Sequence, residues 1–218
     1  MATQNLSEGL ERKLRSEKIL ENEGVPIARS LPIIETTADL TPRTKEEVAY
    51  RAIVLLVAAA KADGLEQAEV EACITHYGIS EHISPKELKF FKNTSPSYED
   101  ELEFDARCEA AWTLLWALGY VESLGMPTHI CDAAEAVGYI VGKSTVDFIA
   151  GAELRPLAEI LDQADLIYRY DWAVVDAHIN GRELPAGLIG IVTQERHYAL
   201  NWLIRYADRE WDDISTDT

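Results

Sequence analysis

The sequence has few cysteines and no long apolar run, and each shortage argues against a class of protein. Its three cysteines, Cys73, Cys108 and Cys131, are odd in number and widely spaced, so no disulfide framework can be read from them. This usage fits a reducing compartment best. The longest apolar run, Ala52 to Ala60, is far too short to cross a bilayer, and the first residues are polar and charged, unlike a signal peptide. We therefore expect a cytoplasmic protein that does not enter a membrane.

Basic residues are also scarce. The chain carries 20 Lys and Arg against 38 Asp and Glu, which gives a formal net charge of −18. Nucleic acids and anionic membrane surfaces are bound by clustered Lys and Arg, so neither is expected as a partner. The acidic excess is compatible with a basic protein partner, and it is equally compatible with simple solubility.

Strand-like alternation of apolar and polar residues is nearly absent, whereas helical periodicity recurs throughout the chain. Thr44 with Glu47 three residues later forms a capping box that predicts the start of one helix, and Ser84-Pro85 marks the start of another. The run 146–150 fits a short strand or a turn of helix equally well. Helices are predicted over 7–22, 44–63, 65–76, 85–92, 98–124, 133–142, 156–180 and 193–211.

With 218 residues, 47% of them hydrophobic, the chain can bury one sizeable core. We expect a mainly α fold, a compact multi-helix domain with a central buried helix and few or no strands. Residues 1–218 are expected to form a single helical domain. The turn-rich stretch 93–97 permits an N-terminal lobe over 1–95 and a C-terminal lobe over 96–218.

The stretch from Pro156 to Asn180 is apolar on nearly every side, which is typical of a helix in the middle of a protein. It also carries a narrow charged stripe. Asp165, Arg169 and Asp176 are spaced i, i+4 and i+11, so they lie close together on one helix face. We therefore predict a buried polar stripe at the centre of the fold.

The last predicted helix repeats this pattern with His197 and Asn201, and two sequential helices joined by a short loop usually pack antiparallel. If the two polar stripes face each other, Arg169 can hold an anionic group while His197 acts as acid or base. Alternatively, the central stripe is a buried ion-pair network and the terminal stripe faces water. Trp172 either helps to wedge these helices together or belongs to a ligand-stacking box.

No complete metal or nucleotide motif is present. Cys73 and His76 form half of a zinc-type spacing, but no second half with the expected spacing follows. Gly138 to Ser144 has one residue too few between its glycines for a phosphate-binding loop, and no predicted strand precedes it. We expect neither a metal nor a cofactor.

Much of the chain resembles a known family. The resemblance is carried by RSEKILENEGVPI, EEVAYRAIVLL, EAAWTLLWALG, LRPLAEILDQADLIYRYDWAVVDAHINGRELPAGL and ERHYALNWLIRYADREWDDISTDT. These stretches resemble the bacterial family called domain of unknown function 4272. That resemblance implies a tryptophan near Ala106 and a basic residue in place of His178, and this chain has neither. It implies no reaction.

Two functions follow from these observations. The first is a non-catalytic, acidic interaction module that binds a partner, for which the charge of −18 and the lack of a complete catalytic motif argue. The alternative is a small-ligand-binding protein or hydrolase-like enzyme that uses the polar stripe between the last two helices. Its candidate residues are Asp165, Arg169, Trp172, Asp176, His197 and Asn201.

Overall fold

This computed structural model describes residues 2–218, with side chains described from Ser7 onward. That part of the chain contains nine α-helices and several short 3-10 turns, joined by irregular segments. No residue in that part forms a strand. The helices are α1 (Ala2–Glu23), α2 (Lys45–Ala62), α3 (Gln67–Tyr77), α4 (Pro85–Lys92), α5 (Tyr98–Ala117), α6 (Ala133–Gly138), α7 (Thr145–Gly151), α8 (Leu157–Ile179) and α9 (Gly190–Leu203). The predicted mainly α class is confirmed, and the ambiguous run at 146–150 is helical.

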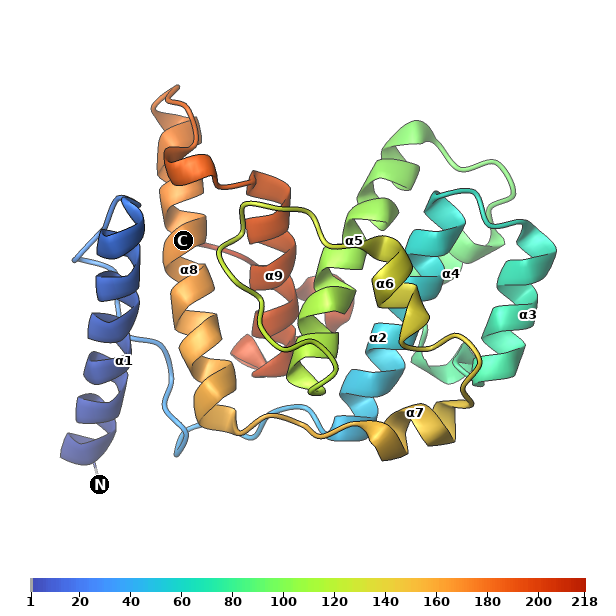
Figure 1. The fold of residues 1–218 in the computed structure, drawn as a ribbon, viewed down its shortest axis with the longest axis horizontal. Helices are drawn as coiled ribbons and strands as arrows, with labels where there is room; N and C mark the ends of the chain where they lie inside the picture. Colours follow the sequence, from blue (N-terminus) through green and yellow to red (C-terminus); the bar gives the residue numbers. More distant parts are fainter. Residues whose placement is uncertain (1) are drawn as a thin grey trace.

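The long helices stand in a row (Figure 1). α1 packs on α8, α8 on α9, α9 on α5 and α5 on α2, while α3, α4 and α7 cover the remaining sides of α2. The α1–α8 and α2–α5 contacts both join residues before position 95 to residues after it. The division into lobes 1–95 and 96–218 stays a prediction.

α8 is enclosed, as its composition predicts. From Ile160 to Ala177 no residue as a whole is exposed, because α1 covers one face and α9 another, and the side chain of Asp162 is the partly exposed exception at 43%. α2 is even more deeply buried: its residues from Val48 to Ala59 are almost all inaccessible to solvent. No helix among residues 2–218 is both long and apolar enough to cross a membrane.

Local capping defines several helix starts. Thr44 accepts a hydrogen bond from the Glu47 amide while the Glu47 carboxylate accepts one from the Thr44 amide, so the predicted capping box of α2 is confirmed. Ser84 with Glu87 forms the same arrangement at α4. These side chains satisfy amides that a helix leaves unpaired at its first turn.

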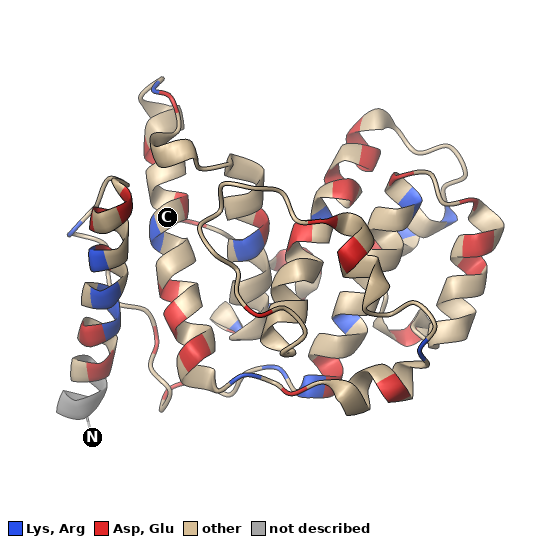
Figure 2. Ribbon diagram, in the orientation of Figure 1, with Lys and Arg blue, Asp and Glu red and all other residues tan. Residues whose placement is uncertain are grey.

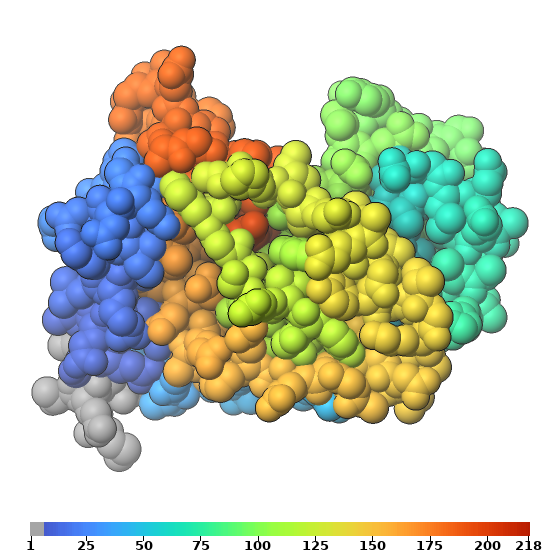
Figure 3. Space-filling model, in the orientation of Figure 1, coloured from blue at the N-terminus to red at the C-terminus, as the bar shows by residue number. Residues whose placement is uncertain are grey.

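The prediction of one helix over 98–124 is wrong, because α5 ends at Ala117. Gly119 has a φ of +81°, and a Cβ there would lie 2.9 Å from the carbonyl oxygen of Glu153. The chain approaches closely here because the Glu153 amide donates to the Leu118 carbonyl. A distant segment therefore terminates α5, and residues 118–132 form an irregular connection that lies across one face of the molecule (Figure 3).

The prediction of a helix over 193–211 is also wrong at its end. α9 stops at Leu203, and Arg205, Ala207 and Asp208 adopt left-handed φ angles of 52–56°. Such angles disfavour helix continuation in L-residues. The C-terminal segment 205–218 consequently turns back along the bundle instead of extending α9.

Candidate functional site

Asp165 and Arg169 form a sealed ion pair within α8. Arg169 Nε donates to Asp165 Oδ2 at 2.9 Å and Nη2 donates to Oδ1 at 2.7 Å. Their side chains are 0% and 2% exposed. Arg169 Nη2 also donates to the Pro32 carbonyl. The pair thereby holds the segment 24–44, the irregular arm that joins α1 to α2, onto α8. Bidentate geometry in a dry setting makes this a strong structural contact.

Asp176 does not join that pair. It lies near the end of α8, where its carboxylate binds Arg182 and accepts a hydrogen bond from Asn180 at 3.0 Å. These contacts close the turn after α8. The structure therefore brings together Asp165 and Arg169 of the predicted charged stripe, and places Asp176 in a separate cluster.

His197 pairs with a residue that the stripe did not include. Its Nδ1 lies 2.8 Å from Asp171 Oδ2, and the two residues are only 2% and 3% exposed. The alternative in which the terminal stripe faces water is wrong at His197 and Asn201, because both are buried. Asp171 lies on α8 two residues beyond Arg169, so it occupies a different helix face.

A cavity of about 240 Å³ opens beside His197. Its walls come from four separate parts of the chain: the arm at 32–35, α8, α9 with the turn after it, and the C-terminal segment. The lining residues that bear polar side chains are Glu35, Tyr168, His197, Asn201, Tyr206 and Asp217. Isoleucines and Ala164 supply an apolar side. This mixture of apolar wall and a few polar groups is typical of small-molecule sites.

The groups around the cavity retain hydrogen-bonding capacity. His197 Nδ1 is hydrogen-bonded to the Asp171 carboxylate, whereas Nε2 has no hydrogen bond to a protein group within the described residues. A carboxylate at one ring nitrogen fixes the tautomer and leaves the other nitrogen for a ligand. Tyr168 lies 5.9 Å from the imidazole, centroid to centroid, and burial raises the pKa of its hydroxyl, which keeps it protonated as a donor. Asn201 Nδ2 donates to the Ser215 carbonyl, so the C-terminal segment is fastened next to the cavity.

Trp172 is half-buried against the core and does not line this cavity. The aromatic contact at the end of the bundle joins Trp202 to Trp211 instead, with centroids 5.6 Å apart in an edge-to-face arrangement. Of the predicted site residues, His197 and Asn201 line the cavity, while Arg169 supports the arm that forms another of its walls.

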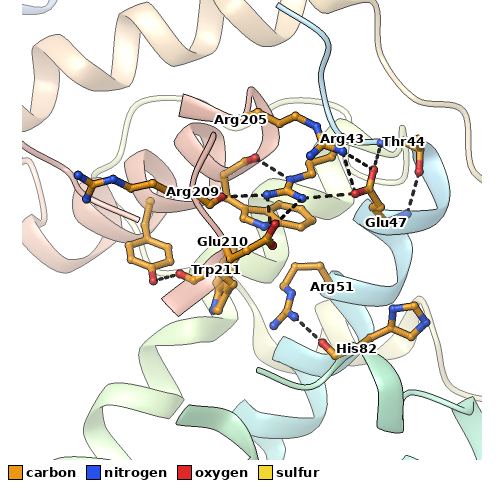
Figure 4. A network of polar contacts seen from close by, with 11 residues as sticks. Arg43, Thr44, Glu47, Arg51, His82, Arg205, Arg209, Glu210 and Trp211 are labelled. Atoms are coloured by element: carbon orange, nitrogen blue, oxygen red, sulfur yellow. Dashed lines mark hydrogen bonds and ion pairs between the residues drawn. The ribbon is translucent and has the colours of Figure 1, made fainter. Parts of the chain in front are cut away.

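A second concavity, of about 620 Å³, lies between α2, α4 and the C-terminal segment. Figure 4 shows the polar network on one side of it. Arg43 donates to the Arg209 carbonyl at 2.9 Å and contacts Glu47 and Glu210, and its guanidinium lies 4.9 Å from the Trp202 ring. These contacts hold the C-terminal segment against the start of α2.

Arg51, next along α2, donates to the His82 carbonyl at 2.5 Å (Figure 4). It also donates to the Glu87 carboxylate at 2.6 Å. Its guanidinium also lies 5.1 Å from the Trp211 ring. Both arginines of this cleft are therefore already paired. The carboxylates of Glu81 and Asp213 at its rim are exposed and carry no ion pair within the described residues.

Asp171 and Tyr168 were not predicted from the sequence, and neither were the arginines of the second cleft. An available indication for Asp171 was that it is an acid within a helix predicted to be enclosed, where a carboxylate needs a partner. Nothing local indicated that Arg43 and Arg51 approach tryptophans more than 150 positions away.

The chain matches a known protein family. The family model described as a domain of unknown function (DUF4272) matches residues 12–214 of the 218. No curated protein and no solved structure matched the chain. The family match covers nearly the whole chain and agrees with the resemblance found in the sequence. The chain therefore belongs to the DUF4272 family, a domain of unknown function.

Proposed function

We propose that this protein binds a small polar ligand in the cavity between α8, α9 and the 32–35 segment, with His197 as the group that contacts it. The observation that carries the proposal is His197 itself, which lines that cavity while its Nδ1 lies 2.8 Å from Asp171, and both residues are almost wholly buried. A buried histidine is held there in one tautomer while its second nitrogen remains available.

The size and lining of the cavity restrict the ligand. At about 240 Å³ it lies below the usual range for drug-sized ligands, so the ligand is a small molecule with few heavy atoms. Its polar part meets Nε2 of His197 and the hydroxyl of Tyr168, and its apolar part lies against Ile33 and Ala164. The same imidazole can transfer a proton to or from a bound molecule, which is the chemistry of the enzymatic alternative.

A His197→Asn variant tests this proposal. The asparagine amide can still donate to Asp171, as Nδ1 does, but it lacks Nε2. We expect its affinity for the ligand to fall roughly 10- to 100-fold, because one buried hydrogen bond worth about 1.5–3 kcal/mol is lost. The measurement is a thermal-shift screen of small polar metabolites against wild type, His197→Asn and His129→Asn, an exposed histidine that serves as the matched control.

The proposal is supported if a compound raises the Tm of wild type and of His129→Asn equally and raises that of His197→Asn much less. The proposal fails if no compound raises the Tm of the wild type. It also fails if each compound that does so stabilises His197→Asn to the same extent.

The second cleft supports a further candidate function, the binding of a basic protein. Its two arginines are paired with Glu47 and Glu87, whereas Glu81 and Asp213 expose unpaired carboxylates at the rim within the described residues. Glu210 is also largely exposed, although its carboxylate contacts Arg43 at 3.4 Å. Acidic residues are also spread over most helices (Figure 2). A cationic side chain entering the cleft would meet opposite charge there, which favours salt-sensitive association.

Oligolysine is the probe for this second function. We expect replacement of Glu81, Glu210 and Asp213 by their amides to weaken its binding about tenfold at low salt, since three exposed contacts contribute about 0.5 kcal/mol each. The matched control neutralises Glu69, Glu99 and Asp105, three exposed acids that do not line the cleft. The measurement is the affinity for oligolysine by isothermal titration calorimetry. If both triple variants lose the same affinity, the binding depends on net charge alone and the cleft is not the binding site.

A further inference from the structure

Two cysteines from different parts of the chain meet in the core. Cys108 lies on α5 and is buried, and Cys131 is half-buried immediately before Asp132, the N-cap of α6. Their Sγ atoms are 3.5 Å apart, and both cysteines are free thiols. A disulfide needs a separation of about 2.05 Å, so closure requires a movement of roughly 1.5 Å.

The surrounding contacts hold Cys131 in this position. Its backbone amide donates to the carboxylate of Glu109, the residue next to Cys108. Arg196 on α9 donates to the carbonyls of Leu124 and Gly125, at 2.8 and 2.9 Å. The irregular 118–132 segment is thus attached to α5 and α9 (Figures 1 and 3), and its end presents the thiol to Cys108.

We propose that Cys108 and Cys131 are a site of reversible oxidation, at which a peroxide converts the two thiols into a disulfide. One thiolate attacks the peroxide O–O bond and becomes a sulfenic acid, releasing water or an alcohol. The other sulfur attacks that sulfenic sulfur, forms the S–S bond and displaces a second molecule of water. Two thiols are oxidised by two electrons while one peroxide is reduced, and a dithiol reverses the reaction.

The environment makes this oxidation slow. The contact with Cys108, together with burial, raises the pKa of Cys131 and leaves little thiolate at neutral pH. We therefore expect oxidation to need sustained exposure to peroxide. The product would fasten the 118–132 segment to α5 and close a loop between positions 23 apart in the sequence. A loop of that length should raise Tm by roughly 5–10 °C.

Peptide mapping under non-reducing conditions tests the proposal. Full-length wild type, Cys108→Ser, Cys131→Ser and Cys73→Ser are treated with hydrogen peroxide, and the remaining thiols are then blocked. Cys73, on α3, is the matched control because it contacts neither of the other cysteines within the described residues. We expect wild type and Cys73→Ser to lose two hydrogen atoms, to give a linked peptide pair containing positions 108 and 131, and to return to the reduced form with dithiothreitol.

Two results measured on the wild-type protein would overturn the proposal, and neither depends on whether the serine variants fold. One is that both thiols stay free after prolonged treatment. The other is that Cys108 or Cys131 gains oxygen to form a sulfinic acid without any linked peptide. A Tm that is unchanged on oxidation despite a linked peptide would contradict the inferred attachment of the 118–132 segment.

Discussion

Replacing Arg169 by leucine is expected to lower the free energy of unfolding by about 3–5 kcal/mol. The reason is that Asp165, which is 0% exposed, would remain charged or unsatisfied in an apolar setting. The variant also loses the hydrogen bond to the Pro32 carbonyl, which holds the arm beside the cavity. Equilibrium unfolding in urea, followed by tryptophan fluorescence and circular dichroism, measures the change.

A double variant distinguishes a buried pair from a local packing effect. Replacing Asp165 and Arg169 together by leucine removes both charges, so its loss should be smaller than the sum of the two single losses. A loss of less than about 1 kcal/mol for Arg169→Leu, the range of exposed ion pairs, would contradict a sealed ion pair in α8.

Replacing Trp211 by alanine is expected to lower the free energy of unfolding by about 3–5 kcal/mol, as for other buried tryptophans. Trp211 is 3% exposed and packs edge-to-face on Trp202, while Arg51 lies over its ring. Its backbone carbonyl accepts a hydrogen bond from the hydroxyl of Tyr198. Without this anchor the segment 205–218 should detach, and its amides should lose protection from hydrogen exchange. Urea unfolding and amide exchange measure the two effects.

Trp172→Ala is the matched control for that experiment, because Trp172 is half-buried and lies outside the C-terminal segment. It should cost less stability and leave the exchange of 205–218 unchanged. Loss of Trp211 should also weaken ligand binding, since Asp217 and the Asn201–Ser215 contact lie at the cavity. Equal destabilisation by the two variants, with the C-terminal amides still protected, would mean that Trp211 does not anchor the segment.

The parts of the fold that could be predicted are those with local causes. Thr44 and Glu47 are three residues apart, so the sequence alone indicates the capping box that starts α2. The stretch that forms α8 has apolar residues on nearly every side, and this indicates in the same way that the helix is enclosed. The ends of α5 and α9 could not be predicted. α5 stops where the Glu153 segment approaches Gly119, and α9 stops at a run of left-handed residues that includes Arg205.

The candidate site shows the same limit. Helical spacing correctly placed Asp165 beside Arg169, because i and i+4 positions are neighbours on any α-helix. It also indicated His197 and Asn201 as one face of α9. Which face of α8 meets His197 depends on how the two helices rotate against each other, and spacing within one helix does not contain that information. The contact between Asp171 and His197 is therefore visible only in the packed structure.

Nitrogen NMR of the histidine rings tests the central claim most directly. In protein labelled with ¹⁵N-histidine, the neutral His197 ring should carry its proton on Nδ1, where Asp171 accepts it. Adding the compound with the largest thermal shift should move the Nε2 resonance of His197 and leave that of His129 in place. A proton on Nε2 in the free protein, or a His197 ring that does not respond to the bound compound, would contradict the proposed site.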